Sequence, residues 1–331
     1  MVDHLARDGV EQEPAAHRLR RALAGFAIHD TAFHLLTLTA AWAVLLLLGG
    51  VIASLAVGSM PAVKAFGLNF LTAQTWNPVT EKFGALAPIY GTVVTSLIAM
   101  LVAVPSAFGI AIFLTELCPF ALRRPIGIAV ELLAGIPSII YGIWGLFVLA
   151  PFLQEHIQPP LIAAFANVPF LSSLFAGPPY GIGIFTAGII LAIMVLPIVT
   201  SISRDIFDSV PSILKEAAFG LGSTTWEVVW SVIIPYTRVG LIGGVMLGLG
   251  RALGETMAVT FVIGNAHKVA PSLLAPGTTI SATIANEFTE AVGDLYTSAL
   301  IALGLILFVI TFIILALSRL MLMRLHMREG L

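Results

Sequence analysis

Six long apolar segments, separated by polar stretches, dominate the pattern of the 331-residue chain. A helix needs about 20 consecutive apolar residues to cross the hydrocarbon core of a bilayer, and each segment reaches that length. Turn sequences such as Gly177-Pro178-Pro179 lie between the segments. The pattern predicts an all-α integral membrane protein with six transmembrane helices, at residues 35–57, 88–115, 125–149, 180–202, 239–263 and 298–320.

Composition supports this class and removes others. Charged residues make up 10% of the chain, against about a quarter in soluble domains, and the net charge of −2 offers no basic surface for nucleic acid. The single cysteine, Cys118, allows no intrachain disulfide, and the seven histidines show no metal-ligand spacing. We therefore expect a protein surrounded by membrane lipid that binds neither nucleic acid nor metal.

The distribution of basic residues predicts the orientation. Residues 1–34 read as a polar tail, and the apolar segment behind it exceeds the roughly 7–15 residues of a signal-peptide core, so it is expected to stay as an anchor. Twelve of the sixteen Lys and Arg residues lie in the tail, in alternate loops and at the C-terminus, against three on the opposite side. By the positive-inside rule both termini of the transmembrane domain, residues 35–331, are cytoplasmic in a multi-pass protein of the cytoplasmic (inner) membrane.

The loop at 203–238, also on the basic side, has a pattern of its own. Pro211 suits the start of a short helix, and Gly220 and Gly222 suit its end. Thr224 followed three residues later by Glu227 fits a capping box, which predicts that a second helix starts at once. The loop is thus expected to be a helix, a sharp glycine turn and another helix.

Three features of this loop resemble the EAA loop of ABC importer permeases: Glu216-Ala217-Ala218, then Gly222 six residues after Glu216, then Val232-Ile233-Ile234-Pro235. The departures from the family pattern, Val232 for Ile and Ile234 for Leu, are apolar exchanges. The resemblance implies a type I ABC importer (MetI-like) permease fold, in which this loop is the coupling helix that docks on an ATPase subunit. The chain contains no Walker A sequence for nucleotide phosphates, so it is expected not to be an enzyme, and ATP and Mg are expected on the partner ATPase.

Arg251 is the one basic residue near the middle of a predicted span. A central arginine costs about 2.5–3.5 kcal/mol on insertion scales, so it should have a partner or a function. Glu255 follows at a spacing that places both side chains on one face of a helix. On the same face Gly240, Gly244 and Gly248 form a stripe of small residues through which another helix can approach closely.

Two interpretations of this charged pair stay open. The Arg251 guanidinium can bind a phosphate-type oxyanion through paired N–H donors, with Glu255 neutralising it when no anion is present. Alternatively the pair holds helices together. A pair that exchanges partners as substrate passes would satisfy both interpretations.

The stretch from Arg251 to Asn265, Arg-Ala-Leu-Gly-Glu-Thr-Met-Ala-Val-Thr-Phe-Val-Ile-Gly-Asn, resembles the PstC family of phosphate importer permeases. The segment 135–142, Gly-Ile-Pro-Ser-Ile-Ile-Tyr-Gly, agrees with it, and the resemblance covers about residues 65–320. It implies ATP-driven, binding-protein-dependent translocation of inorganic phosphate with Arg251 and Glu255 on the path. It also implies a homologous PstA-like permease, two PstB-like ATPase subunits and an extracytoplasmic PstS-like phosphate-binding protein.

Within the third predicted span, Pro137 frees a backbone carbonyl, which Ser138, water or a neighbouring helix must satisfy. A kink facing a polar cavity and a kink that serves packing alone are both consistent with this. Glu131, nearer the inner end of the span, is expected to meet water, Arg123 or Arg124.

Other functions remain as alternatives at this point. A permease for sulfate or molybdate fits the charge of Arg251 equally well. A secondary transporter or channel would use Arg251 and Glu255 as an ion relay and need no ATPase, and a sensory or scaffold protein would transport nothing. The EAA loop disfavours the transporter or channel, and an ATPase or binding-protein gene nearby would disfavour the sensory or scaffold protein.

Overall fold

The computed structural model describes residues 15–328, so residues 1–14 of the predicted tail and the last three residues lie outside the described part. Within it the regular elements are helices, beside one isolated antiparallel bridge between Asn77 and Lys82. The chain divides into two units, residues 1–54 and 55–331, which we describe separately. The first unit contains most of α1 (Ala15–Gly58), which includes residues 15–34 of the predicted tail.

Six stretches of helix are long and apolar enough to cross a membrane: Asp30–Gly58, Leu86–Leu117, Ser138–Phe165, Ile184–Asp208, Thr225–Gly254 and Asp294–Arg324. This agrees with the number of predicted spans. Four of the predicted segments lie largely within one of these stretches. The third and the fifth differ, because both predicted segments contain an interruption of the helix.

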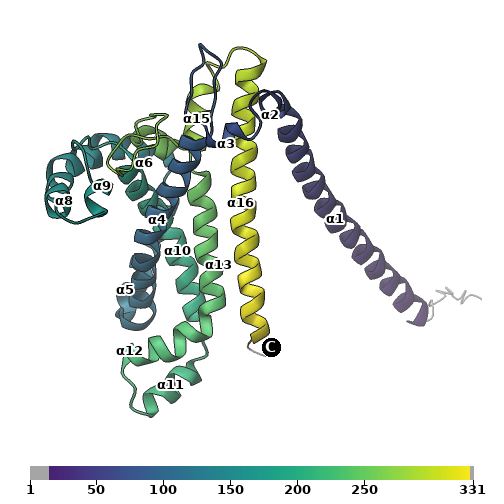
Figure 1. Ribbon diagram of the computed structural model, residues 1–331. Helices are drawn as coiled ribbons and strands as arrows, with labels where there is room; N and C mark the ends of the chain where they lie inside the picture. Colours follow the sequence, from purple (N-terminus) through teal and green to yellow (C-terminus); the bar gives the residue numbers. More distant parts are fainter. Residues whose placement is uncertain (1–14, 329–331) are drawn as a thin grey trace, which may run out of the picture. The chain divides into compact units, whose positions relative to one another are not determined.

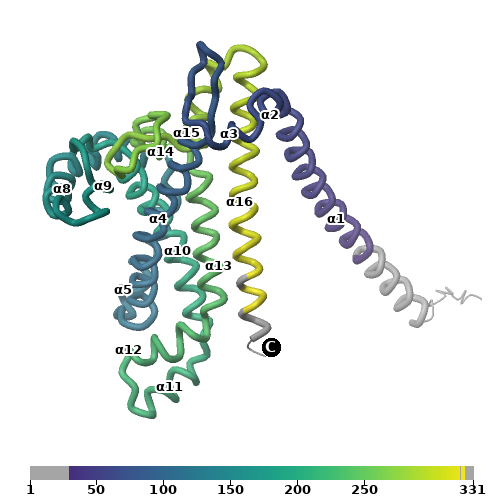
Figure 2. Tube along the Cα trace, viewed as in Figure 1, coloured from purple at the N-terminus to yellow at the C-terminus, as the bar shows by residue number. Residues whose placement is uncertain are grey.

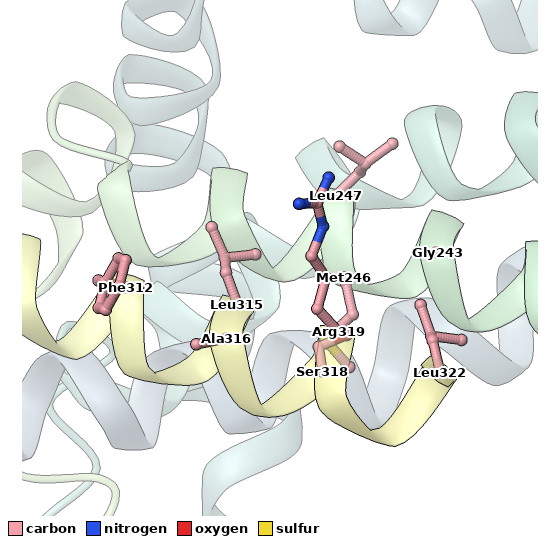
Figure 3. Close-up of a pocket in the computed structure, with 9 residues that line it drawn as sticks. All are labelled: Gly243, Met246, Leu247, Phe312, Leu315, Ala316, Ser318, Arg319 and Leu322. Carbon is pink, nitrogen blue, oxygen red and sulfur yellow. The ribbon is translucent and has the colours of Figure 1, made fainter. Parts of the chain in front are cut away.

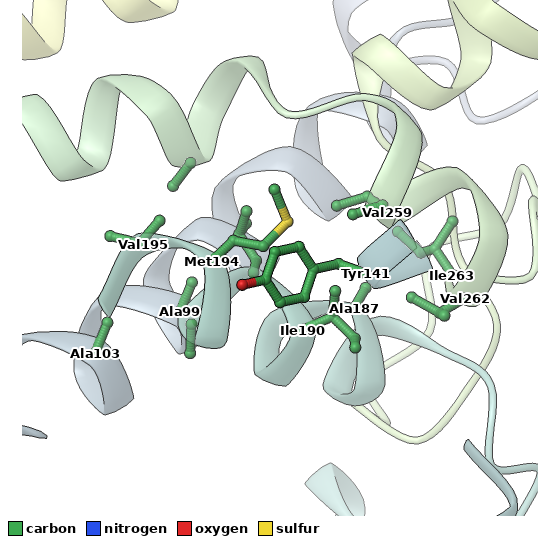
Figure 4. Packing of buried hydrophobic residues seen from close by; sticks show 14 of the residues in the cluster. Ala99, Ala103, Tyr141, Ala187, Ile190, Met194, Val195, Val259, Val262 and Ile263 are labelled. Atoms are coloured by element: carbon green, nitrogen blue, oxygen red, sulfur yellow. The ribbon is translucent and has the colours of Figure 1, made fainter. Parts of the chain in front are cut away.

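Three helices form the centre of the second unit: α4 (Leu86–Ile112), α10 (Ile184–Asp208) and α13 (Ile234–Gly254). They pack on one another although they are far apart in the sequence (Figures 1 and 2). Figure 4 shows part of the apolar core around α10, in which Ile190 and Val195 are fully buried and Tyr141 and Val259 are nearly so.

The glycine stripe of α13 faces α10. A Cβ on Gly244 would stand 2.8 Å from Ile202 Cγ2, and a Cβ on Gly248 would stand 2.7 Å from Val199 Cγ2. Gly240 faces Ile206 in the same way. The predicted close approach of another helix is confirmed, and the helix that approaches is α10 of the same chain.

The third predicted span, 125–149, is not one helix. α5 (Phe120–Ala134) ends, residues 135–137 interrupt the helix, and α6 (Ser138–Trp144) begins a second helical run. Pro137 has no N–H to donate and disfavours a helical conformation of the residue before it, and both effects favour a break here. The Tyr141 hydroxyl bridges it by donating to the Leu133 carbonyl oxygen at 2.8 Å. The second run continues through η2 (Gly145–Leu149), α7 (Ala150–Phe152), η3 (Leu153–Ile157) and α8 (Gln158–Phe165).

The remaining helices lie at the two ends of this unit. At one end are η1 (Phe113–Leu117), α11 (Ser212–Gly220), α12 (Thr225–Val228) and η4 (Val229–Ile233). Towards the other are α2 (Met60–Phe66), α3 (Asn69–Thr72), α9 (Leu171–Leu174), α14 (Met257–Val262) and α15 (Ile280–Glu287), and α16 (Asp294–Arg328) packs along α13 (Figure 1). The loop before α15 lies directly on α4: a Cβ on Gly91 would stand 1.9 Å from the Thr278 carbonyl oxygen, and Thr92 Oγ1 accepts the Ile280 N–H at 2.9 Å.

Candidate functional site

Arg251 lies in the last turn of α13, and its side chain is exposed on the isolated chain. The helix ends at Gly254, a poor helix former, whose carbonyl accepts the Thr256 hydroxyl at 3.3 Å. Glu255 is already extended, with φ −68° and ψ 130°. The prediction that Arg251 and Glu255 share a helical face is therefore wrong, and the part of the chain that the structure describes holds no ion pair between them.

A second interruption lies beside this one. α6 packs on α14 through Gly142, whose Cβ would stand 3.1 Å from Ala258 Cα, and η2, which continues α6, packs on it through Gly145, whose Cβ would stand 3.0 Å from Val262 Cγ1. Residue numbers rise in the same direction in both helical segments from the first contact to the second, so the two segments run parallel where they touch. Ser138 lies four residues before Gly142 and Met257 one residue before Ala258, so at 1.5 Å per residue the two breaks lie within about one helical turn of each other.

Pro137 and Ser138 belong to that neighbouring break. Pro137 is exposed at the N-cap position of α6, and Ser138 is the half-buried first residue of the helix. The kink predicted within a single span is thus a full interruption between two helices. Two helices are thus broken within about one turn of each other, and the exposed Arg251 precedes the second break in the last turn of α13.

An apolar groove opens between α13 and α16 below this level, with a cavity volume of about 510 Å³. Leu247 of α13 lines it and stands one turn from Arg251 on the same side of the helix. Figure 3 shows the Arg319 side chain reaching from α16 across the groove toward Leu247.

The loop at 203–238 has the predicted form. α11 begins directly after Pro211, and Gly222 makes the sharp turn with φ +88°. The capping box of Thr224 and Glu227 is confirmed: the Thr224 N–H donates to Glu227 Oε2 at 2.7 Å, and the Glu227 N–H donates to Thr224 Oγ1 at 3.4 Å.

The residues of the EAA pattern lie on α11 and after it. Glu216 and Ala217 are exposed and Ala218 is half-buried, while Pro235 is exposed in the first turn of α13. α11 and α12 project from one end of the bundle (Figure 1). An exposed helix with small residues in this place can dock on another protein.

Sequence reasoning missed an ion pair between Lys215 of α11 and Glu116 of η1. Lys215 Nζ lies 2.6 Å from Glu116 Oε1, and the two side chains are only 18% and 9% exposed. No local pattern reveals it, because 99 residues separate the partners.

Glu131 pairs with Arg204 at 2.9 Å and not with Arg123 or Arg124.

At the other end of the bundle, His267 lies in a cluster of aromatic and acidic side chains. Its ring stacks on Trp76 at a centroid distance of 5.2 Å, and Nε2 lies 3.5 Å from Glu287 Oε1. The Tyr296 hydroxyl donates to the same carboxylate. Burial lowers the pKa of His267 from its ordinary value of 6.5, and the Glu287 carboxylate opposes that shift.

The chain matches known proteins along most of its length. The family model for the binding-protein-dependent transport system inner membrane component matches residues 107–326. A phosphate transport system permease protein PstC from Mesorhizobium japonicum is 69% identical over 97% of this chain and 98% of its own length. A PstC from Pasteurella multocida is 59% identical over 87% of this chain and 89% of its own length.

More distant proteins also match. A probable PstC from Methanocaldococcus jannaschii is 40% identical over 85% of this chain and 90% of its own length. A solved structure of the inward-facing MetNI methionine ABC transporter aligns with a TM-score of 0.49 at 15% identity, over 75% of this chain and 94% of the other. On the strength of the family model and the close relatives, this all-helical chain with six membrane-spanning stretches belongs to the PstC-type permeases among the binding-protein-dependent transport system inner membrane components.

Proposed function

We propose that this chain is a permease subunit through which inorganic phosphate enters the cell, driven by ATP hydrolysis in a separate subunit. The names of its relatives support phosphate as the substrate. The assembly would contain a homologous PstA-like permease, two PstB-like ATPases that bind ATP and Mg, and a PstS-like binding protein outside. Both termini and the loop carrying α11 would face the cytoplasm, in agreement with the positive-inside rule.

The observation that carries the proposal is the exposed Arg251 directly before one of two helix breaks that lie close together. Its guanidinium can hold a phosphate oxyanion through two parallel N–H donors. Broken helices at membrane depth are tolerated where the backbone is covered by protein or lines a cavity. The exposed side of α13 would therefore form part of the path, with the second permease opposite it.

Glu255 would act as the exchange partner of Arg251. The two residues are not paired in this state, but Glu255 lies in the link between α13 and α14, one residue beyond the helix end. A small rotation of that link would bring its carboxylate to the guanidinium when no anion is present. The pair would then neutralise itself between transport events.

Transport would follow alternating access. Closure of the ATPases would move α11, and the bundle would open outward to accept phosphate from the binding protein. ATP can drive this change only through its different affinity for the two states. The permease itself would carry out no bond chemistry.

The test is phosphate uptake into proteoliposomes that hold the complete importer. We expect wild-type uptake to require ATP, and Arg251→Gln to assemble but to transport at least roughly ten-fold more slowly, as loss of a charge-assisted contact predicts. Arg124→Gln, which removes an exposed charge from α5, is the matched control and should transport normally.

Three results would count against parts of the proposal. Normal transport by Arg251→Gln would remove Arg251 from the path. Uptake that persists without ATP would indicate a secondary transporter. Stronger transport of sulfate or molybdate than of phosphate would replace the substrate while leaving the importer class in place.

A further inference from the structure

The pair of Glu116 and Lys215 joins the EAA helix to a span that is distant in sequence. Lys215 directly precedes Glu216 in α11, and Glu116 lies in η1 at the end of α4. Their 2.6 Å contact is shielded from solvent, since Glu116 is only 9% exposed. Shielding of this kind reduces screening by salt and makes the contact sensitive to geometry.

The local backbone places Glu116 for this contact. The end of α4 widens into a π-helical turn, in which the Cys118 N–H donates to the Phe113 carbonyl oxygen at 2.7 Å. Arg123 holds the same turn from α5 by donating to the Thr115 carbonyl oxygen at 2.7 Å. π-turns inside helices occur frequently at functional sites.

Stability alone is a weak explanation for the pair. Withdrawing two charges from water costs about as much as their attraction returns, and an apolar pair of similar size often serves equally well. A buried ion pair is better suited to specifying one arrangement over another. The arrangement that this pair specifies is the position of α11 relative to α4.

α4 extends from that contact to the opposite end of the bundle. Midway, Met100 Cε would lie 3.7 Å from a Cβ on Gly248 of α13. At its start, Gly91 and Thr92 hold the loop before α15. α11 also follows α10 directly in the chain, and it packs on α12 and η4, which lead into α13. The ion pair adds a direct polar link from the coupling helix to the end of α4.

We propose that Glu116 and Lys215 are positioning residues that transmit movement of the EAA helix to α4, so that ATP hydrolysis and opening of the bundle stay coupled. This inference rests on the proposed function as an ATP-driven importer. It assigns no contact with the transported anion to either residue.

The experiment uses the complete importer in proteoliposomes and measures uptake, ATP hydrolysis and their ratio. The variants are Glu116→Gln, Lys215→Met, the charge-conserving Glu116→Asp and the exchange Glu116→Lys with Lys215→Glu. We expect each neutralised variant to hydrolyse ATP while its uptake per ATP falls roughly ten-fold, within the usual range of coupling energies. Uptake per ATP in Glu116→Asp should lie between that of the neutralised variants and that of wild type. The exchange variant should regain most of the wild-type uptake per ATP.

The matched control is a second ion pair at this end of the bundle, Arg204 with Glu131, which joins α10 to α5. Arg204→Gln and Glu131→Gln should reduce the amount of assembled complex without changing uptake per ATP. Neutralised variants that keep the wild-type ratio would overturn the proposal. So would an exchange variant that assembles fully yet regains nothing, or control variants that lose coupling to the same degree.

Failure of the proposed function has a different signature. If the wild-type importer takes up no phosphate, the substrate assignment fails. Stimulation of ATP hydrolysis by the binding protein then still reports coupling, and it should be lost in Glu116→Gln and Lys215→Met. Stimulation that survives in both variants would reject the role of the pair, whichever anion is transported.

Discussion

Gly142 of α6 lies directly against Ala258 of α14, with no room for a side chain between them. A Cβ on Gly142 would stand 3.1 Å from Ala258 Cα and 2.7 Å from Phe261 Cδ2. This contact holds the second halves of two broken helices together. The arrangement around Arg251 thus depends on a residue whose only contribution is the absence of a side chain.

We expect Gly142→Ala to destabilise the permease by about 1–3 kcal/mol, the usual cost of overpacking a tight contact. Phe261 can turn aside, but the backbone of Ala258 cannot. Thermal unfolding of the purified complex in detergent measures the loss, and phosphate uptake should fall with it. Unchanged stability would show that α6 and α14 are less closely packed than the structure indicates.

Gly91→Ala should be more severe. The new methyl group would stand 1.9 Å from the Thr278 carbonyl oxygen, a backbone atom, so the loop before α15 must leave α4. We expect little or no assembled complex by size-exclusion chromatography. Gly109→Ala is the control in the same helix, because open space surrounds that position, and it should assemble normally.

Tyr141→Phe removes the hydroxyl that bridges the break between α5 and α6. Loss of its 2.8 Å bond to the Leu133 carbonyl should cost about 0.5–1.5 kcal/mol, the net value of an ordinary hydrogen bond. Thermal unfolding should show the decrease. Tyr236→Phe, at an exposed position on α13, is the comparison that should stay at the wild-type value.

Gly222→Ala tests the turn of the EAA loop. Its φ of +88° is left-handed, which costs a residue with a Cβ roughly 1–2 kcal/mol. We expect weaker retention of the ATPase subunits during purification. Gly220→Ala, inside α11 with open space around it, should retain them. Equal retention in the two variants would contradict a strained turn.

The His267 cluster predicts a pH dependence of stability. Because burial lowers the pKa of His267, the unfolded chain takes up more protons than the folded one at pH values below the ordinary value of 6.5. The stabilisation should be complete above that pH and decline as the pH falls through the window beneath it.

Melting temperatures between roughly pH 5 and pH 7.5, a range that brackets the ordinary histidine value, measure this decline. The dependence of melting temperature on pH should become flatter in His267→Gln, where Glu287 and Tyr296 remain as neighbours. Exposed His156 supplies the comparison, since His156→Gln should keep the wild-type slope.

Local patterns in the sequence predicted local structure well. Spans follow from the length of apolar runs, and the form of the EAA loop follows from Pro211, Gly222, Thr224 and Glu227, which act on their immediate neighbours. The glycine stripe of α13 also has a helical period that can be recognised, although the sequence does not say which helix it meets.

The break at Glu255 was missed because the apolar residues on both sides of it together reach the length of one unbroken span. It depends on Gly254 and on the packing of α14 against α6, which hydropathy does not contain. The contact of Glu116 with Lys215 has no local signal, since it is created only when α4 and α11 are brought together. The predicted pairing of Arg251 with Glu255 failed because an i, i+4 spacing places two side chains on one face only while the helix continues, and α13 ends at Gly254.

The first membrane-crossing stretch, Asp30–Gly58, has 29 residues. As a straight helix it is about 43 Å long at 1.5 Å per residue, whereas the hydrocarbon core of a bilayer is about 30 Å thick. The surplus must be absorbed by tilting, by burial in the headgroup layers or by local thickening of the membrane. Acyl-chain length is therefore an experimental variable for this permease, and vesicles of thin and thick lipids will hold its first helix at different inclinations.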